Sequence, residues 1–253
     1  MTEATLHHRL GALGLYGAAG QLDDLIALAT KKRWGPTQIL EHVADIEERE
    51  RSRRGLERRL SRSHLGPFKT IADYDWNWPT KIDRPLVEAA IGGHFVGAAR
   101  NVVLVAPQGL GKTMIAQNIA HQAVVAGHSV LFTTAAQMLL DLGGQESSRA
   151  LERRLRHYAK QTLLVVDEVG YLAFDNRNAD LLFQVVSRRY ERKSLVLTTN
   201  LAFKDWPSVF PNATCATALI DRVIHHADVI GIEGRSYRLR EAEDAAVKTK
   251  PTK

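Results

Sequence analysis

Hydrophobic positions follow a helical spacing through the first quarter of the chain. In residues 5–30 the apolar side chains recur three or four positions apart, and Ile39, Val43 and Ile46 fall on one face of a second helix. A Trp-Gly-Pro turn separates the two stretches. Residues 1–65 are therefore predicted to form a small all-α N-terminal domain.

From about residue 84 the pattern changes to short β-rich runs that alternate with helical segments. The candidate strands are residues 101–105, 129–134, 162–167, 194–200 and 227–234. Most of them are apolar without alternation, as strands covered on both faces are. This pattern predicts an α/β domain over residues 66–242, with a parallel β-sheet flanked by helices.

Three further segments complete the predicted organisation. Residues 64–85 are rich in proline and aromatic residues and are interpreted as a connector that wraps onto the α/β domain. The run Ser-Tyr-Arg-Leu-Arg-Glu, residues 236–241, is expected to close a hairpin at the edge of the sheet. Residues 243–253 are predicted to be a disordered basic tail.

Net charge and cysteine content indicate which kinds of partner and which cellular compartment to expect. The 253 residues carry a formal net charge of +6, which favours an acidic partner such as nucleic acid or an anionic membrane surface. The single cysteine, Cys215, can form no internal disulfide, as suits a reducing compartment. No apolar run approaches the ~18 residues of a membrane-spanning helix. We expect a cytoplasmic protein without a membrane partner.

Residues 106–114, Ala-Pro-Gln-Gly-Leu-Gly-Lys-Thr-Met, lie between a candidate strand and a candidate helix. That context is the one a phosphate-binding loop requires, because backbone N–H groups and the positive helix end surround the phosphates. Lys112 would bridge the terminal phosphates of ATP and Thr113 would bind Mg²⁺. The usual first glycine is replaced by Ala106, which is tolerable only if its φ is negative. A glycine-rich turn without a ligand is the alternative.

Acidic and amide side chains follow two later strands. Asp167 and Glu168 end the run Leu-Leu-Val-Val-Asp-Glu, where Asp167 would hold Mg²⁺ and Glu168 would activate the attacking water. Asn200 ends the next strand and could contact the γ-phosphate or the water. Helix capping by Asp167 and an ordinary turn at Asn200 are the alternatives. The candidate nucleotide-binding residues are Gly109, Leu110, Gly111, Lys112, Thr113, Met114 and Asp167.

These residues resemble a known group of proteins. The loop APQGLGKT resembles the GPPGxGKT loop of AAA+ ATPases, LLVVDE resembles their Walker B strand, and TTN resembles sensor 1. Residues 188–210 and 216–241 are similar to IstB-type ATPases, the transposition helper proteins of insertion sequences, and more distantly to DnaC-type helicase loaders. The resemblance covers residues 66–242 strongly and the N-terminal part less distinctively.

The resemblance implies an ATPase that assembles with copies of itself on duplex DNA and assists a transposase in target selection. In such assemblies an arginine of a neighbouring subunit completes the ATP site. Arg222 matches that position, with Arg189 as a second candidate and a local salt bridge as the alternative for Arg222. No lid domain is evident after residue 242, so a sensor 2 arginine is not assigned.

Two basic clusters are candidates for contact with DNA. One lies between residues 49 and 62 and the other between residues 149 and 160. Both could contact phosphates without reading sequence, although internal pairing with nearby glutamates is the alternative. The predicted DNA-binding residues are Arg53, Arg54, Arg58, Arg149, Arg153, Arg154 and Arg156.

Three other functions remain open at this point. A helicase loader shares nearly every motif and differs in its partner. A P-loop small-molecule kinase has no use for Glu168 or for an arginine from a neighbour. A DNA-binding protein with a degenerate ATP site is disfavoured by Lys112, Asp167 and Glu168.

Overall fold

The computed structural model describes residues 5–171, 173–211 and 213–240. The chain divides into two compact units, one formed by residues up to Arg58 and the other by residues from Arg59 onward. The predicted tail, residues 243–253, lies outside the described residues.

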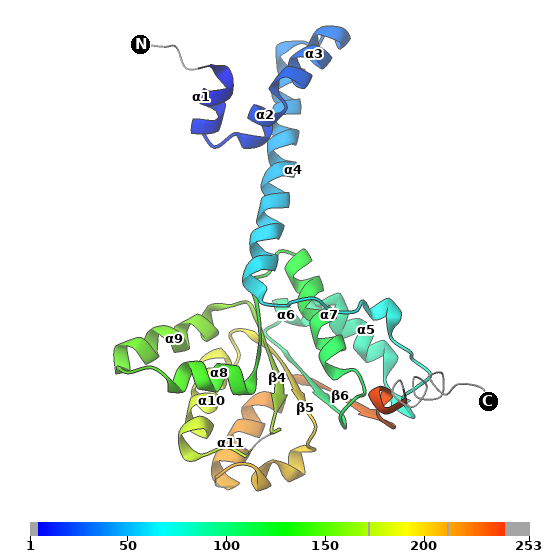
Figure 1. Ribbon diagram of the computed structural model, residues 1–253, viewed down its shortest axis with the longest axis vertical. Helices are drawn as coiled ribbons and strands as arrows, with labels where there is room; N and C mark the ends of the chain where they lie inside the picture. The colour runs from blue at the N-terminus through cyan, green and yellow to red at the C-terminus, as the bar shows by residue number, and fades with distance from the viewer. Residues whose placement is uncertain (1–4, 172, 212, 241–253) are drawn as a thin grey trace, which may run out of the picture. The chain divides into compact units, whose positions relative to one another are not determined.

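The second unit contains a six-stranded sheet (Figure 1). Its strands are β1 (Lys81–Ile82), β2 (Asn101–Val105), β3 (Val130–Thr134), β4 (Leu163–Val169), β5 (Ser194–Thr199) and β6 (Ala227–Glu233). The spatial order is β1-β6-β2-β5-β4-β3, with β1 antiparallel to β6 and every other pair parallel. All five predicted strands are present, and the α/β fold with a mostly parallel sheet is confirmed.

Helices cover both faces of this sheet (Figure 1). One face packs against α5 (Arg84–Gly92) and α7 (Lys112–Val125), and the other against α8 (Ala135–Gly143), α10 (Asn176–Arg189) and α11 (Ala213–Ile224). The remaining helical elements are α6 (His94–Gly97), α9 (Ser148–Lys160), η1 (Ile71–Asp73) and η2 (Phe203–Ser208). Strand residues such as Val103, Leu164 and Leu197 form a buried core with α8, α10 and α11.

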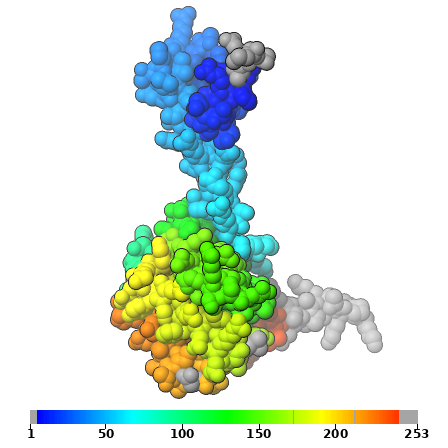
Figure 2. All heavy atoms as spheres, turned by 90° about the vertical axis from the view of Figure 1, so that its left-hand side faces the viewer, coloured from blue at the N-terminus to red at the C-terminus, as the bar shows by residue number. Residues whose placement is uncertain are grey.

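Helices α8 and α9 occupy an exposed side of this unit (Figure 2). Asp141 of α8 accepts hydrogen bonds from Arg154 and from the Tyr158 hydroxyl of α9, the latter at 2.6 Å. Glu152 of α9 accepts two hydrogen bonds from Arg188 of α10, at 2.9 and 2.8 Å. These contacts fix α9 against both neighbouring helices.

The expected edge hairpin at residues 236–241 is wrong for the residues that the structure describes. Residues 237–240 are helical, and the strand antiparallel to β6 is β1. The Tyr237 N–H donates to the Gly109 carbonyl at 2.9 Å, and the Leu239 N–H reaches the Ser236 hydroxyl at 3.4 Å. Ser236 thus provides a helix N-cap, a local signal that favours a helical turn over a strand.

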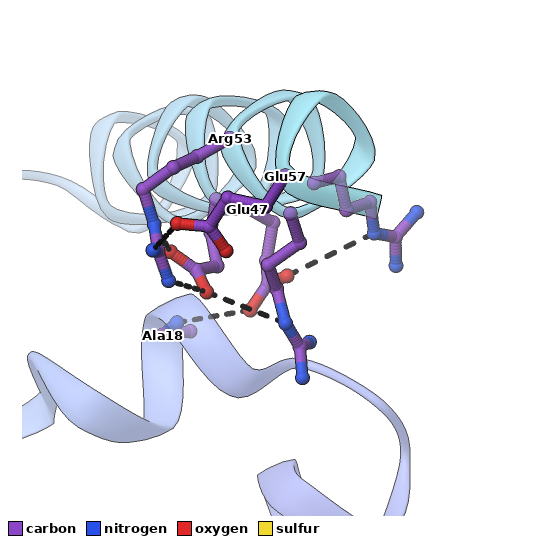
Figure 3. A network of polar contacts seen from close by, with 7 residues as sticks. Ala18, Glu47, Arg53 and Glu57 are labelled. Atoms are coloured by element: carbon purple, nitrogen blue, oxygen red, sulfur yellow. Dashed lines mark hydrogen bonds and ion pairs between the residues drawn. The ribbon is translucent and has the colours of Figure 1, made fainter. Parts of the chain in front are cut away.

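The first unit consists of α1 (Leu6–Ala12), α2 (Tyr16–Gly20), α3 (Leu22–Lys32) and the first part of α4 (Pro36–Ser63). Buried Glu47 of α4 accepts the Ala18 N–H at 2.9 Å and so satisfies a first-turn donor of α2 (Figure 3). A Cβ on Gly17 would lie 2.9 Å from Glu50, so glycine permits this close approach. Within the described ranges, no helix has the length and apolar character needed to cross a bilayer.

Candidate nucleotide-binding site

The loop between β2 and α7 has the backbone shape that the sequence predicts. Gly109 and Gly111 have φ values of 78° and 83°, in the left-handed region that favours glycine. A Cβ on Gly109 would lie 2.1 Å from the Ser236 hydroxyl oxygen, and one on Gly111 would lie 2.5 Å from the Tyr74 ring. Ala106 is not among the described residues with positive φ, so its methyl group fits. The glycines keep open a cradle that side chains would fill.

Two polar side chains project from the start of α7. The Lys112 ammonium donates to the carbonyl oxygens of Ala106 and Pro107 at 2.6 and 2.8 Å. Burial lowers the pKa of Lys112, with Asp167 and Glu168 opposing that shift and Arg238 adding to it. The Thr113 hydroxyl donates to Asp167 Oδ2 at 2.9 Å. Thr113 of the loop helix and Asp167 of β4 therefore contact one another directly.

The carboxylates at the end of β4 have different environments. Asp167 is 4% exposed and also accepts a hydrogen bond from the Thr198 hydroxyl. Glu168 is exposed and lines the cavity beside the loop. Its φ of 62° is unusual for a residue other than glycine. In the sheet β5 lies between β2 and β4, so Asn200 at the end of β5 lies between the loop and the acidic pair.

These elements enclose a cavity of about 480 Å³, within the range of small-molecule sites. Lys112, Thr113, Glu168 and Asn200 line it together with the rest of the loop. The combination of a backbone cradle, one ammonium group and a hydroxyl beside a carboxylate fits a nucleotide phosphate chain with Mg²⁺. The cavity thus brings together the loop, Glu168 and Asn200, which the sequence predicted separately, and Asp167 is connected to it through the Thr113 hydroxyl.

The cavity is also lined by residues outside the predicted set of nucleotide-binding residues. The Tyr74 hydroxyl donates to the Leu110 carbonyl at 3.0 Å, and burial raises its pKa to about 12, which keeps that proton in place. Trp78 donates to the Arg235 carbonyl at 2.8 Å, and its ring meets Tyr237 edge to face. Arg238 also lines the cavity. The aromatic content of the connector was the available signal for Tyr74 and Trp78.

Comparisons with known proteins agree with this geometry. The sequence model of the IstB-like ATP binding protein family matches residues 8–245. The chain belongs to this family. It is 37% identical over 231 residues to the ATP-binding protein of insertion sequence IS21 from Pseudomonas aeruginosa, covering 91% of this chain and 87% of that protein. It is also 37% identical over 180 residues to the IS232 protein of Bacillus thuringiensis subsp. berliner, covering 70% and 72%.

Solved structures share the fold of this IstB-like chain. The crystal structure of DnaI aligns with a TM-score of 0.53 at 19% identity, covering 66% of this chain and 92% of that one. AMPPCP-bound DnaA from Aquifex aeolicus aligns with a TM-score of 0.56 at 16% identity, covering 74% and 57%. At these identities the likeness concerns the fold alone.

The two arginine candidates of this IstB-like chain have different positions. Arg222 lies on α11, with its guanidinium carbon 4.5 Å from the Phe183 ring centre and a hydrogen bond of 3.1 Å to the Ala218 carbonyl. Within the described ranges its guanidinium donates to this backbone carbonyl and to no carboxylate, and Arg222 does not line the cavity. The alternative of a salt bridge with Asp221 is therefore wrong.

Arg189 is a structural residue, so its assignment as a second candidate is wrong. It is 1% exposed and donates to five carbonyl oxygens, those of Tyr158, Ala159, Gln161, Thr162 and Ser194. Burial lowers its pKa to about 9, which leaves the guanidinium charged at neutral pH. It joins the end of α9 to the starts of β4 and β5 and cannot reach another subunit.

The predicted DNA-binding arginines differ in their availability. Arg154 pairs with Asp141 and Arg156 with Glu152, whereas Arg149 and Arg153 are exposed and have no polar partner among the described residues. In the first unit, Arg53 pairs with Glu50 and Glu57 (Figure 3). Arg54 pairs with Glu50 and stacks on Tyr16, and Arg58 is exposed. Four of the seven predicted DNA-binding arginines thus have a carboxylate partner within the chain.

Glu191, His225 and His226 form a second group of potential ligand atoms, lying within 4.8 Å of one another. All three are exposed. Glu191 lies 3.4 Å from His226 Nε2, and the Tyr190 hydroxyl is 2.6 Å from His225 Nδ1. Because these atoms have partners within the chain, their proximity does not require a metal ion.

Proposed function

We propose that this chain is a Mg²⁺-dependent ATPase that assembles with copies of itself on duplex DNA and assists a transposase in selecting target sites. The observation that carries the ATPase proposal is the convergence of Lys112, Thr113, Asp167, Glu168 and Asn200 around one cavity. Membership in a family of ATP-binding proteins supports ATP as the nucleotide. We place this activity in the cytoplasm.

Each residue of the cavity has a distinct proposed role. Backbone N–H groups of residues 109–114 surround the phosphates, and Lys112 bridges the β- and γ-phosphates. Thr113 and Asp167 would hold Mg²⁺, which would neutralise charge on the phosphate oxygens. Glu168 orients the attacking water and accepts its proton. Asn200 contacts the γ-phosphate or that water from the end of β5.

Arg222 is proposed to complete the site of a neighbouring subunit. It lies outside the cavity of its own chain, and its partly exposed guanidinium contacts the Phe183 ring and the Ala218 carbonyl rather than a carboxylate among the described residues. A guanidinium placed at the γ-phosphate stabilises the charge of the transition state. This role requires two copies of the chain for each complete site.

Arg222→Ala is expected to lower the rate of phosphate release by about 10³-fold or more, with ATP binding retained. Mixing it with Lys112→Ala should partly restore turnover, because the Lys112→Ala subunit supplies Arg222 to the intact cavity of its neighbour. A control mixture pairs Lys112→Ala with the double variant Arg222→Ala/Glu168→Gln and should stay inactive. If the first mixture recovers no activity, an action of Arg222 across the interface is contradicted.

Duplex DNA is proposed to contact the α9 surface. Arg149 and Arg153 lie four residues apart, so they share one helix face, and both side chains are exposed. Contacts with phosphates give affinity that is largely independent of sequence, which suits a protein that acts on many targets. Arg154 and Arg156 of α9 are proposed to join this surface by exchanging their carboxylate partners for phosphate. In the first unit, Arg58, Arg53 and Arg54 are proposed as separate phosphate contacts, of which Arg53 and Arg54 would exchange glutamate partners.

Changing both Arg149 and Arg153 to glutamate should reduce the slope of log affinity against log salt concentration by about 1.8, since each lost phosphate contact contributes about 0.9. The measurement is a fluorescence-anisotropy titration of labelled duplex at several salt concentrations. The charge-matched control is Arg192→Glu/Lys204→Glu, which changes two exposed residues outside α9. Equal slopes for both double variants would remove α9 from the DNA contact.

The transposase is proposed as partner because relatives with high identity are encoded by insertion sequences. A mobile element must insert into new DNA. An ATPase bound to duplex DNA would give the transposase a target site, and ATP hydrolysis would release the ATPase from that DNA. The alternative function, a helicase loader, would instead be expected to assemble preferentially on single-stranded DNA.

A further inference from the structure

Thr198 is a fully buried residue of β5, the strand between β2 and β4. Its hydroxyl contacts both acidic residues at the end of β4. The Glu168 backbone N–H donates to Thr198 Oγ1 at 2.9 Å, and Thr198 Oγ1 donates to Asp167 Oδ1. One hydroxyl thus joins two consecutive residues that have different proposed roles.

The directions of these hydrogen bonds are fixed by the number of protons. A backbone N–H can only donate, so Thr198 Oγ1 is the acceptor from Glu168. The single hydroxyl proton of Thr198 is then free for Asp167, which also accepts the Thr113 hydroxyl on its other oxygen. Asp167 is held from both sides by threonine hydroxyls, one from the loop helix and one from β5.

The same hydroxyl supports an unusual backbone at Glu168. The register between β4 and β5 shifts between Val166 and Val169, so Glu168 lies outside the regular ladder. Its N–H therefore needs another acceptor, and Thr198 provides it. Glu168 also has a φ of 62°, a conformation that is costly for a residue with a Cβ and needs support from its surroundings. This bulge leaves the Glu168 side chain exposed at the cavity while Asp167 and Val169 stay buried.

We infer that Thr198 is a positioning residue that couples the metal-holding Asp167 to the water-activating Glu168. This inference rests on the proposed ATPase function. Without the hydroxyl, the Glu168 N–H and one Asp167 oxygen lose their partners inside the protein. Asp167 is then free to turn away from Thr113, and Glu168 is free to leave its left-handed conformation. Nucleotide binding through the loop and Lys112 does not depend on this hydroxyl.

The test compares Thr198→Val, which keeps the shape, with Thr198→Ser, which keeps the hydroxyl. In Thr198→Val we expect kcat for ATP hydrolysis to fall by about 10- to 100-fold, because Asp167 and Glu168 are no longer held in position. The Kd for ATP should change by less than about 3-fold. Thr198→Ser should stay within about 3-fold of the unchanged protein in kcat. Hydrogen exchange at the Glu168 amide, measured without nucleotide or Mg²⁺, should accelerate by about 10-fold in Thr198→Val and not in Thr198→Ser.

Thr133→Val is the matched control, because Thr133 is a threonine of β3 that is 8% exposed and whose hydroxyl, among the described residues, donates to the Thr134 carbonyl at 3.3 Å and to no side chain. It should keep normal turnover and normal exchange at Glu168. If Thr198→Val does not fold, Thr198→Ala and Thr198→Ser provide a second pair that differs by the hydroxyl alone.

Equal kcat and equal Glu168 exchange within either pair would overturn the role of Thr198. The proposed ATPase function would survive that result if Glu168→Gln still stops hydrolysis. Absence of ATP hydrolysis by the unchanged protein on duplex DNA would overturn both.

Discussion

Lys112→Ala is expected to weaken ATP binding by about 10- to 100-fold, because the loop loses its charge-assisted hydrogen bonds to the phosphates. Lys112 is the ammonium group at the start of α7 that lies beside the cradle formed by Gly109 and Gly111. Its burial among the loop carbonyls keeps it in place before a phosphate arrives. Titration with a fluorescent ATP analogue measures the loss.

The control for this change is Lys204→Ala, which removes an exposed lysine of η2 outside the cavity. It should bind ATP with unchanged affinity. If Lys112→Ala also binds ATP normally, the loop is not the phosphate site, and the assignment of the whole cavity to ATP is wrong.

Glu168→Gln is expected to retain ATP and to lower the hydrolysis rate by about 100-fold or more, which is the contribution of a general base. The amide has nearly the same shape as the carboxylate but cannot accept the proton from water. Because Asp167 and Thr113 are unchanged, Mg²⁺ and nucleotide should still bind. Phosphate release and the nucleotide content of the isolated protein report the two effects separately.

Stalled hydrolysis should also trap assemblies on DNA that would otherwise turn over. The control is Glu146→Gln, the same chemical change at an exposed residue after α8. Normal turnover in Glu168→Gln would mean that another residue is the base, while the loop assignment would remain.

The local parts of the site could be predicted from sequence because each part is short and has a strong physical signature. Buried parallel strands are continuous apolar runs, so the ends of β2, β4 and β5 could be located. The loop glycines and Lys112 follow β2 directly. Polar residues that follow parallel strands lie at the carboxyl edge of the sheet, so the placement of Asp167 and Asn200 at that edge can be predicted from their positions in the sequence.

The rest of the site depends on contacts between residues that are distant in sequence. The insertion of β5 between β2 and β4 is a property of topology, and no local pattern specifies it. The cavity wall joins Trp78 to Arg235, a separation of 157 residues. Arg189 lies in a run of charged residues, which is typical of an exposed segment, yet its side chain is buried. Carbonyl groups from three elements accept its hydrogen bonds there. The structural role of Arg189 can therefore be recognised only from the three-dimensional structure.

The basic clusters illustrate a third limit. A run of arginines gives net charge, but it does not tell which guanidinium groups already have partners. In the structure, Arg149 and Arg153 have no acidic partner among the described residues. Arg154, by contrast, pairs with the carboxylate of Asp141 on α8. The pairing of Arg156 with Glu152 was foreseeable from their spacing of four residues.

Mass photometry of the unchanged protein tests its assembly on DNA, using short duplex or single-stranded DNA with Mg²⁺ and either ATP or ADP. We expect multi-subunit complexes that form on duplex DNA with ATP and not with ADP. Assembly that prefers single strands would favour a helicase loader over the transposition helper. A monomer that is indifferent to DNA and nucleotide would contradict both the shared active site and the assembly on DNA.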